Sequence, residues 1–263
     1  MANEGKALAV RDVGAVVIRD VPGFEDFDRQ DLVVPRLYLV QATSQLPGDP
    51  PVGTFWNNLT GEARPEVKAV VLRYKKTRVM FDPEDVTGAP VCASDDNEKP
   101  RTPLNFKELK TFHPALADMV LDGVFDVIDN CRTCPFGDAY WAVGGPPPCN
   151  LTYVFLCLDL EREEAPFLLS VRKTGIREAK KLISAMYFRR QPFFSVPVTI
   201  RSKKMQDQRG KWFVPYFELG EPFSEEKLAY YQAFYEDLVG VEITAAEDVE
   251  PLSEEAVEEE IPF

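Results

Sequence analysis

The 263-residue sequence contains a single histidine, His113, and no apolar run long enough to span a membrane. It also lacks two glycine-rich phosphate-binding patterns, GxxxxGK followed by Ser or Thr, and GxGxxG. These absences argue against most nucleotide-dependent and histidine-based enzymes, so we expect a protein that is not an enzyme and takes no small-molecule substrate. Residues 1–20 mix both charges and have no signal-peptide core, so we expect a cytoplasmic location with no membrane partner.

Positive charge is scarce overall: the sequence has 30 Lys and Arg but 43 Asp and Glu, which gives a formal net charge of −13. The acidic excess is confined to residues 221–263, which hold fourteen acidic residues and one lysine. Residues 1–220 are neutral, with 29 residues of each sign. Taken whole, the charge argues against a polybasic nucleic-acid binder, whereas a neutral body with an acidic tail remains compatible with one.

Cysteine is also sparse, and the five residues are Cys92, Cys131, Cys134, Cys149 and Cys157. An odd, clustered set in a reducing compartment predicts a metal site and one spare thiol better than disulfides. Cys131 and Cys134 form a CxxC pair that can bind one metal across a tight turn, and Cys92 and Cys149 complete four ligands for a structural Zn²⁺. His113 is the alternative to Cys92 as the fourth ligand. Cys157, between two leucines, is expected to be a buried hydrophobe.

The order of the expected elements indicates a mainly β protein with a few helices, of the α+β class. Strands are expected at 33–42, 151–160, 166–171, 193–203 and 211–219. Two more are expected at 66–81, separated by Lys75 and Lys76 and forming either a hairpin or a sharply bent pair. Helices are expected at 175–190 after Thr174 and from Ser224 to about 239. Five strands with one helix late in their order are what an OB-fold barrel requires.

The chain therefore divides into four expected parts. Residues 1–60 form an N-terminal extension packing on the core, and residues 61–220 form an OB-like core with a zinc ribbon inserted around 92–150. Residues 221–240 form a C-terminal helix, and residues 241–263 form a disordered acidic tail.

Cations and aromatic rings alternate within the core, where residues 151–220 carry thirteen basic and seven acidic residues. The rings include Tyr187 and Phe188, which precede Arg189 and Arg190. Single-stranded DNA requires this combination, because cations follow the phosphates while rings stack on the bases. The alternative is that strand aromatics belong to the core and the lysines to a solvated face. The candidate nucleic-acid contacts are Arg73, Lys75, Lys76, Arg78, Trp141, Arg172, Lys173, Arg201, Lys203, Lys204 and Trp212.

The most specific feature is the C-terminal sequence Glu258, Glu259, Glu260, Ile261, Pro262 and Phe263. An apolar tip on an acidic segment suits docking, because the ring can fill an apolar pocket while the glutamates and the terminal carboxylate meet basic groups. This tail resembles the C-terminal tip of bacterial single-stranded DNA-binding proteins. The resemblance covers about the last ten residues and implies recruitment of replication, recombination and repair proteins by these six positions.

The body is longer than that family's usual domain and lacks its Gly/Gln/Pro-rich linker. Its layout looks more like the C-terminal domain in the largest polypeptide of replication protein A, and it is also similar to bacteriophage replication proteins, which implies a divergent phage version in the cytoplasm of a bacterial host. We expect a single-stranded DNA-binding protein. The alternatives are a zinc-ribbon transcription or recombination regulator acting through protein partners, and a metal-dependent nuclease using carboxylates such as Asp95, Asp96, Asp126 and Asp129, whose spacing matches no motif.

Overall fold

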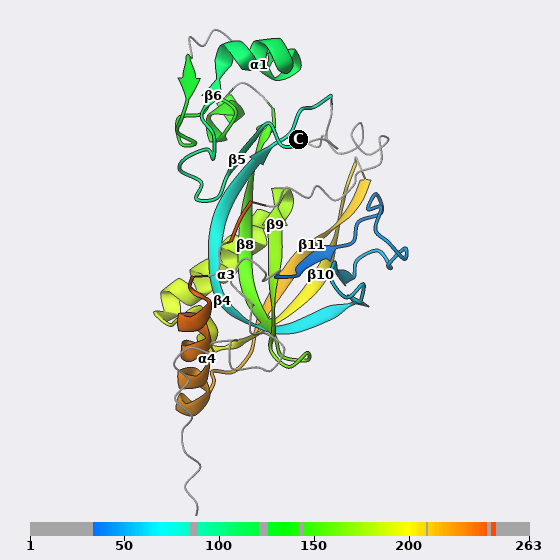
Figure 1. Ribbon diagram of the computed structural model, residues 1–263. Helices are drawn as coiled ribbons and strands as arrows, with labels where there is room; N and C mark the ends of the chain where they lie inside the picture. The colour runs from blue at the N-terminus through cyan, green and yellow to red at the C-terminus, as the bar shows by residue number, and fades with distance from the viewer. Residues whose placement is uncertain are drawn as a thin grey trace, which may run out of the picture.

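The computed structural model describes residues 34–84, 89–120, 126–142, 145–208, 210–240 and 243–245. Most of them belong to one curled, largely antiparallel sheet that bends into a half-barrel (Figure 1). Its strands in chain order are β1 (Arg36–Leu39), β2 (Phe55–Asn57), β3 (Ala63–Arg64), β4 (Glu66–Met80), β5 (Cys92–Ser94), β8 (Cys149–Asp159), β9 (Ala165–Arg172), β10 (Pro197–Asp207) and β11 (Gly210–Leu219). They pair in the order β11-β10-β4-β8-β9-β1-β2-β3, and β5 pairs with β4.

Strand β4 is the longest strand and pairs with β10 along its first part, with β5 at its end and with β8 along most of its length. A register shift between Val71 and Arg73 marks a bulge that bends it. Of the two arrangements expected around Lys75 and Lys76, the hairpin is absent, because both residues remain in the ladder with β8 and 66–80 is one bent strand. The two lysines lie on opposite faces of a continuous strand, which local sequence patterns do not distinguish from a turn.

The concave face of the sheet holds the main core. The ring of Phe155 on β8 contacts that of Phe217 on β11 at 5.7 Å between centroids, although two strands lie between them. Helix α3 (Ile176–Arg189) packs Ala179, Leu182 and Met186 into this core. No side chain caps its N-terminus, and the hydroxyl of Thr174 instead accepts a hydrogen bond from Trp212 Nε1 at 3.0 Å.

The opposite, convex face is covered by helix α4 (Glu225–Leu238), which begins after Ser224 as expected. The Ser224 hydroxyl accepts the Lys227 backbone N–H at 3.4 Å, which caps the first turn. Tyr231 packs with valines and leucines of β4, β8 and β9 in a second core cluster, and Ile243 joins it. The helix is therefore part of the folded body.

Residues 34–60, expected within an N-terminal extension, contribute β1 and β2 to the main sheet. Strand β1 runs parallel to β9, and the chain after it approaches the free edge of β11. The Gln41 side chain donates to the Phe213 carbonyl at 3.0 Å and accepts the Phe213 N–H at 2.9 Å. One side-chain amide thus bridges the two parts of the sheet, in place of a backbone ladder.

The chain between β4 and β8 forms a lobe at one end of the sheet (Figure 1). Its elements besides β5 are β6 (Leu104–Asn105), α1 (Phe106–Phe112), α2 (Pro114–Asp118), β7 (Val127–Ile128) and the 3-10 helix Asp138–Ala142. They share a small core of their own around Phe136 and Leu116. The described residues of this lobe show two short helices and a two-stranded sheet but not the expected zinc ribbon. No helix in the described part of the chain is long and apolar enough to cross a membrane.

Candidate functional site

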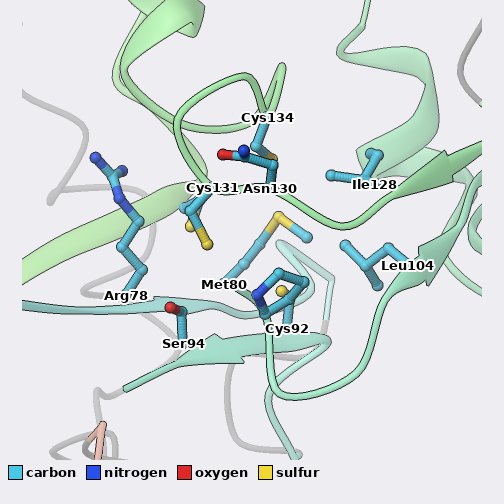
Figure 2. A pocket seen from close by; sticks show the side chains of 11 residues that line it. Arg78, Met80, Cys92, Ser94, Leu104, Ile128, Asn130, Cys131 and Cys134 are labelled. Atoms are coloured by element: carbon cyan, nitrogen blue, oxygen red, sulfur yellow. The ribbon is translucent and has the colours of Figure 1, made fainter. Parts of the chain in front are cut away.

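Four cysteines predicted as metal ligands line one cavity in the lobe. Met80, at the end of β4, is paired with Cys92 on β5 and with Cys149 on β8, so the two ladders bring these cysteines to either side of the same residue. Cys131 and Cys134 enter from the loop after β7. Figure 2 shows Cys92, Cys131 and Cys134 with Met80 around this cavity.

Backbone hydrogen bonds hold the two cysteine-bearing segments in place. The Cys131 N–H donates to the Glu98 carbonyl at 2.8 Å, and the Cys149 N–H donates to the Phe136 carbonyl at 3.0 Å. Burial and then the neighbouring thiols raise the pKa of Cys92 to about 12, and the same causes raise the pKa of Cys149. All five cysteines are free thiols. Across the described residues, no three His, Cys, Asp or Glu side chains are arranged as metal ligands.

His113, the alternative fourth ligand, is engaged elsewhere. Its Nδ1 lies 2.5 Å from Asp82 Oδ2, and it does not line the cysteine cavity. Burial acts to raise the pKa of Asp82, but hydrogen bonds from the Glu84 N–H and His113 outweigh it and lower that pKa. Cys157 is fully buried in the concave core, as expected for a small hydrophobe. The structure thus brings together the four-cysteine set and leaves His113 outside it.

Arg78, predicted as a DNA contact, is buried and lines the cysteine cavity. Its side chain is 4% exposed, donates from Nε to Asn97 Oδ1 at 2.5 Å and pairs through Nη2 with Asp138 at 2.8 Å. Its Nη1 is buried without a hydrogen-bond partner in the described structure. Burial acts to lower the pKa of Arg78, but Asp138 and Cys149 outweigh it and raise that pKa. A fixed positive charge therefore lies beside the thiols.

The other cations of β4 are divided between the faces of the strand. Arg73 is half-buried on the α4 side, and its desolvation lowers its pKa. Lys75 is half-buried, whereas Lys76 lies 5.4 Å from the ring centroid of Tyr153. The sequence cluster is therefore not one continuous basic surface.

The β10–β11 hairpin retains free cations at its far end. Only Pro197–Arg201 of β10 pairs with β4, so the rest of β10 projects with β11 alone. Arg201 is held by Glu66 and Glu218, each at 2.8 Å. Lys203 and Lys204 beyond it are exposed and make no ion pair with the described acidic residues.

The remaining predicted contacts are dispersed. Trp212 is half-buried on β11, and Trp141 is 53% exposed in the lobe. Arg172 is half-buried at the end of β9, and Lys173 is exposed with a positive φ of 50°. The residues predicted to dock partners, Glu258, Glu259, Glu260, Ile261, Pro262 and Phe263, lie outside the described residues, as does the rest of the tail from residue 246.

Sequence reasoning did not single out the segment Ile243–Ala245. Ile243 and Ala245 are almost fully buried, and the Ala245 N–H donates to Asp95 Oδ1 at 2.6 Å. Arg36 donates to the Thr244 carbonyl at 3.3 Å. This anchor fixes the start of the acidic tail beside the lobe. Its two short apolar side chains within an acidic segment were the only available signal.

A comparison with known families finds a match to part of the chain. Residues 148–244 match a family model described as Pam3 phage gp34-like protein. The match includes β8 through α4 and ends at Thr244, so it covers the two hairpins and both long helices but neither β4 nor the cysteine lobe. It suggests a phage protein. No curated protein and no solved structure matches the chain.

Proposed function

We propose that this protein binds single-stranded DNA in phage replication or recombination and recruits partner proteins through Glu258–Phe263. The carrying observation is the strand connectivity. Taken as strands one to five, β4, β8, β9, β10 and β11 pair one with two, two with three, one with four and four with five, and α3 lies between three and four. These four pairings are those expected in an OB-fold and support an OB-like barrel, in which β1 takes the position between strands three and five.

OB-folds bind oligonucleotides with strands two and three and with the loops after strands one and four. Here α4 covers the convex face of β8 and β9, so we favour the two loops as the surface that binds the oligonucleotide. The loop after strand one is the cysteine lobe, and the loop after strand four is the hairpin end that carries Lys203 and Lys204. Both lie toward the same end of the molecule in Figure 1. Their exposed cations suit phosphates, and Trp141 suits stacking on a base.

Fluorescence-anisotropy titration tests this proposal, using labelled oligo-dT, duplex DNA and RNA at two salt concentrations. We expect tight, salt-dependent binding to oligo-dT without cleavage. The variant Lys203→Ala/Lys204→Ala should lower the salt slope by about 1.4, because each phosphate contact on a single strand contributes about 0.7. The control Arg162→Ala/Lys227→Ala removes two exposed charges elsewhere and should bind like the unaltered protein. Absence of binding to any nucleic acid would overturn the proposal and favour a regulator that acts on protein partners.

We further propose that Cys92, Cys131, Cys134 and Cys149 hold a structural Zn²⁺. Four thiolates around Zn²⁺ carry a net charge of −2, which is costly in a buried site without a compensating cation. Arg78 lies beside Cys149, and its buried Nη1 is unsatisfied in the described structure, so it would supply the compensating charge once the four thiols close around an ion. The role of the ion would be structural and not catalytic, because four protein ligands leave no position for a reacting water. It would stabilise the lobe.

Elemental analysis of the purified full chain tests the metal proposal. We expect one zinc per chain, lost in Cys131→Ser/Cys134→Ser and retained in Cys157→Ala, which alters a cysteine outside the cavity. Zinc loss should also lower the thermal stability of the lobe, because metal binding contributes to folding. A metal-free unaltered protein, expressed with zinc in excess, would overturn this proposal and leave DNA binding untouched.

A further inference from the structure

Two aromatic rings stand exposed at the end of α3. Tyr187 and Phe188 are 78% and 79% exposed, more than any other large hydrophobic side chain in the described part of the chain. Their ring centroids are 5.9 Å apart in an edge-to-face arrangement. Met186, next to them in sequence, is buried in the concave core, so the helix is anchored while the pair faces solvent.

The exposed side of the same helix is cationic. Arg177, Lys180 and Tyr187 follow a helical spacing that places them on one side, and Arg189 and Arg190 follow the rings. The one acidic residue of α3, Glu178, is buried and pairs with Lys181 at 2.7 Å. The other four cations make no ion pair with the described residues.

The helix connects this surface to the basic hairpin. It begins next to β11, where Trp212 donates to Thr174 and Gly175 lies close to Pro215. From that end it extends for about 20 Å, at about 1.5 Å per residue, to the aromatic pair. Cations thus lie along α3 between the hairpin and the rings.

We propose that the exposed side of α3 is a second contact surface for single-stranded DNA, with bases stacking on Tyr187 and Phe188 and phosphates meeting Arg177, Lys180, Arg189 and Arg190. This inference rests on the proposed function and extends it from the hairpin to a longer track. The charge favours this occupant, because a helix face with unpaired cations and no exposed acid attracts a polyanion. Solvent-facing rings beside cations also match the stacking platforms of single-strand binders.

The test compares oligo-dT of about 8 and about 30 nucleotides, since OB-type site sizes run from about 4 to 16 nucleotides. The variant Tyr187→Ala/Phe188→Ala should weaken binding of the long oligonucleotide by at least about fivefold, because each stacked base is worth about 1 kcal/mol or more. Binding of the short oligonucleotide should change far less. The control Leu59→Ala/Val239→Ala removes two exposed apolar side chains outside the lobe, the hairpin and α3, and should bind both oligonucleotides like the unaltered protein. Both variants alter exposed residues, so circular dichroism should show an unchanged fold.

Several outcomes separate this inference from the proposed function. If the unaltered protein binds oligo-dT, and the aromatic variant binds each oligonucleotide with the same affinity as the unaltered protein, the assignment of the α3 surface is overturned. The proposed function then stands. If the unaltered protein binds no nucleic acid, both fail. A dimer in solution that the aromatic variant converts to a monomer would identify the surface as a contact between copies and overturn the DNA assignment. The chain's own residues 246–263 are the other possible occupant. If they crosslink to α3 even in the presence of excess oligo-dT, the DNA assignment is also overturned.

Discussion

Arg78 and Lys76 differ in role although they are two residues apart on one strand. Lys76 lies over the Tyr153 ring, whereas Arg78 is buried between Asn97, Asp138 and the cysteine cavity. The difference arises from what covers the strand at each point, because the lobe begins where β4 ends. The residue type alone therefore predicts the charge of a side chain, but not whether that charge is buried in the structure or exposed for binding.

Replacing Arg78 by alanine should destabilise the protein by about 2 kcal/mol, because charge-assisted hydrogen bonds are lost and a void opens. Urea unfolding measures this change. Zinc content should fall with it, since the buried positive charge beside the thiols is removed. The affinity for oligo-dT should change by less than about twofold, because Arg78 contributes no phosphate contact. A salt slope reduced as in Lys203→Ala/Lys204→Ala would contradict this interpretation.

A second residue-scale prediction concerns Asp159 at the end of β8. Its carboxylate binds both terminal nitrogens of Arg64, and both side chains are largely buried. Asp159→Ala should cost about 3 kcal/mol of unfolding free energy, because it leaves the largely buried Arg64 charge with only the more exposed Glu161, 3.6 Å away. Thermal or urea unfolding measures it. The nearby exposed pair Glu62 and Arg162 provides the comparison, and Glu62→Ala should have a far smaller effect. Equal losses of unfolding free energy in Asp159→Ala and Glu62→Ala would show that burial does not make one ion pair more stabilising than the other.

At the scale of elements, capping and hairpin turns follow from local sequence, whereas strand continuity does not. Ser224 begins α4 as its side chain predicts, and the turn between β10 and β11 falls where polar residues and glycine place it. The sequence leaves open a hairpin or a bent pair of strands at 66–81, because only pairing with β8 keeps Lys75 and Lys76 in one continuous strand.

The anchor of Ile243–Ala245 yields an element-scale prediction. Asp95→Ala should release this segment, because Asp95 accepts the Ala245 N–H and also binds Arg101. Amide hydrogen exchange at 243–245 should rise severalfold, while exchange in β8 stays unchanged. The control Glu98→Ala alters an exposed acid that pairs with Arg132 and should leave the segment protected. Unchanged exchange in Asp95→Ala would show that the apolar contacts suffice.

The same anchor should loosen in acid. Burial acts to raise the pKa of Asp95, but Arg101 and the Ala245 N–H outweigh it and hold that pKa below its ordinary value. Because the folded-state pKa is lowered, the stabilisation is complete above the ordinary value of about 3.9 and is lost as the pH falls through the lower folded value. The Ala245 amide signal, followed by NMR from neutral pH to about pH 2, should shift in that acidic range. A midpoint above the ordinary value would contradict the assignment.

For the whole molecule, the decisive property is the separation of a neutral body from an acidic C-terminal segment. Residues 240–263 carry nine acidic side chains and no basic ones, while residues 151–220 carry an excess of six basic ones. Ala245, which precedes the last part of the acidic segment, is fixed beside the lobe by its bond to Asp95, and such tethering raises the effective concentration of the segment that follows. We therefore expect the tail to compete with DNA for the same cations in the proposed function.

Deleting residues 254–263 removes five glutamates and should raise the affinity for oligo-dT severalfold at low salt. The effect should vanish at high salt, because screening weakens the competition between exposed charges. Anisotropy titration at both salt concentrations measures it. Replacing Ile261 and Phe263 by alanine in the full chain is the control, since it keeps the charge and should affect partner docking only. Unchanged affinity at low salt would refute the competition.

The sequence by itself determined the charge partition, the cysteine set, most strand positions and both long helices, because these depend on composition, periodicity and caps within short segments. Tertiary structure decided which of these features meet. The pairing of Met80 with both Cys92 and Cys149 brings distant thiols to one cavity, and the lobe buries Arg78 beside them. It also left Tyr187 and Phe188 in solvent while Tyr74 packed against the core. Ladder register and burial join residues far apart in the chain, so no local pattern specifies them.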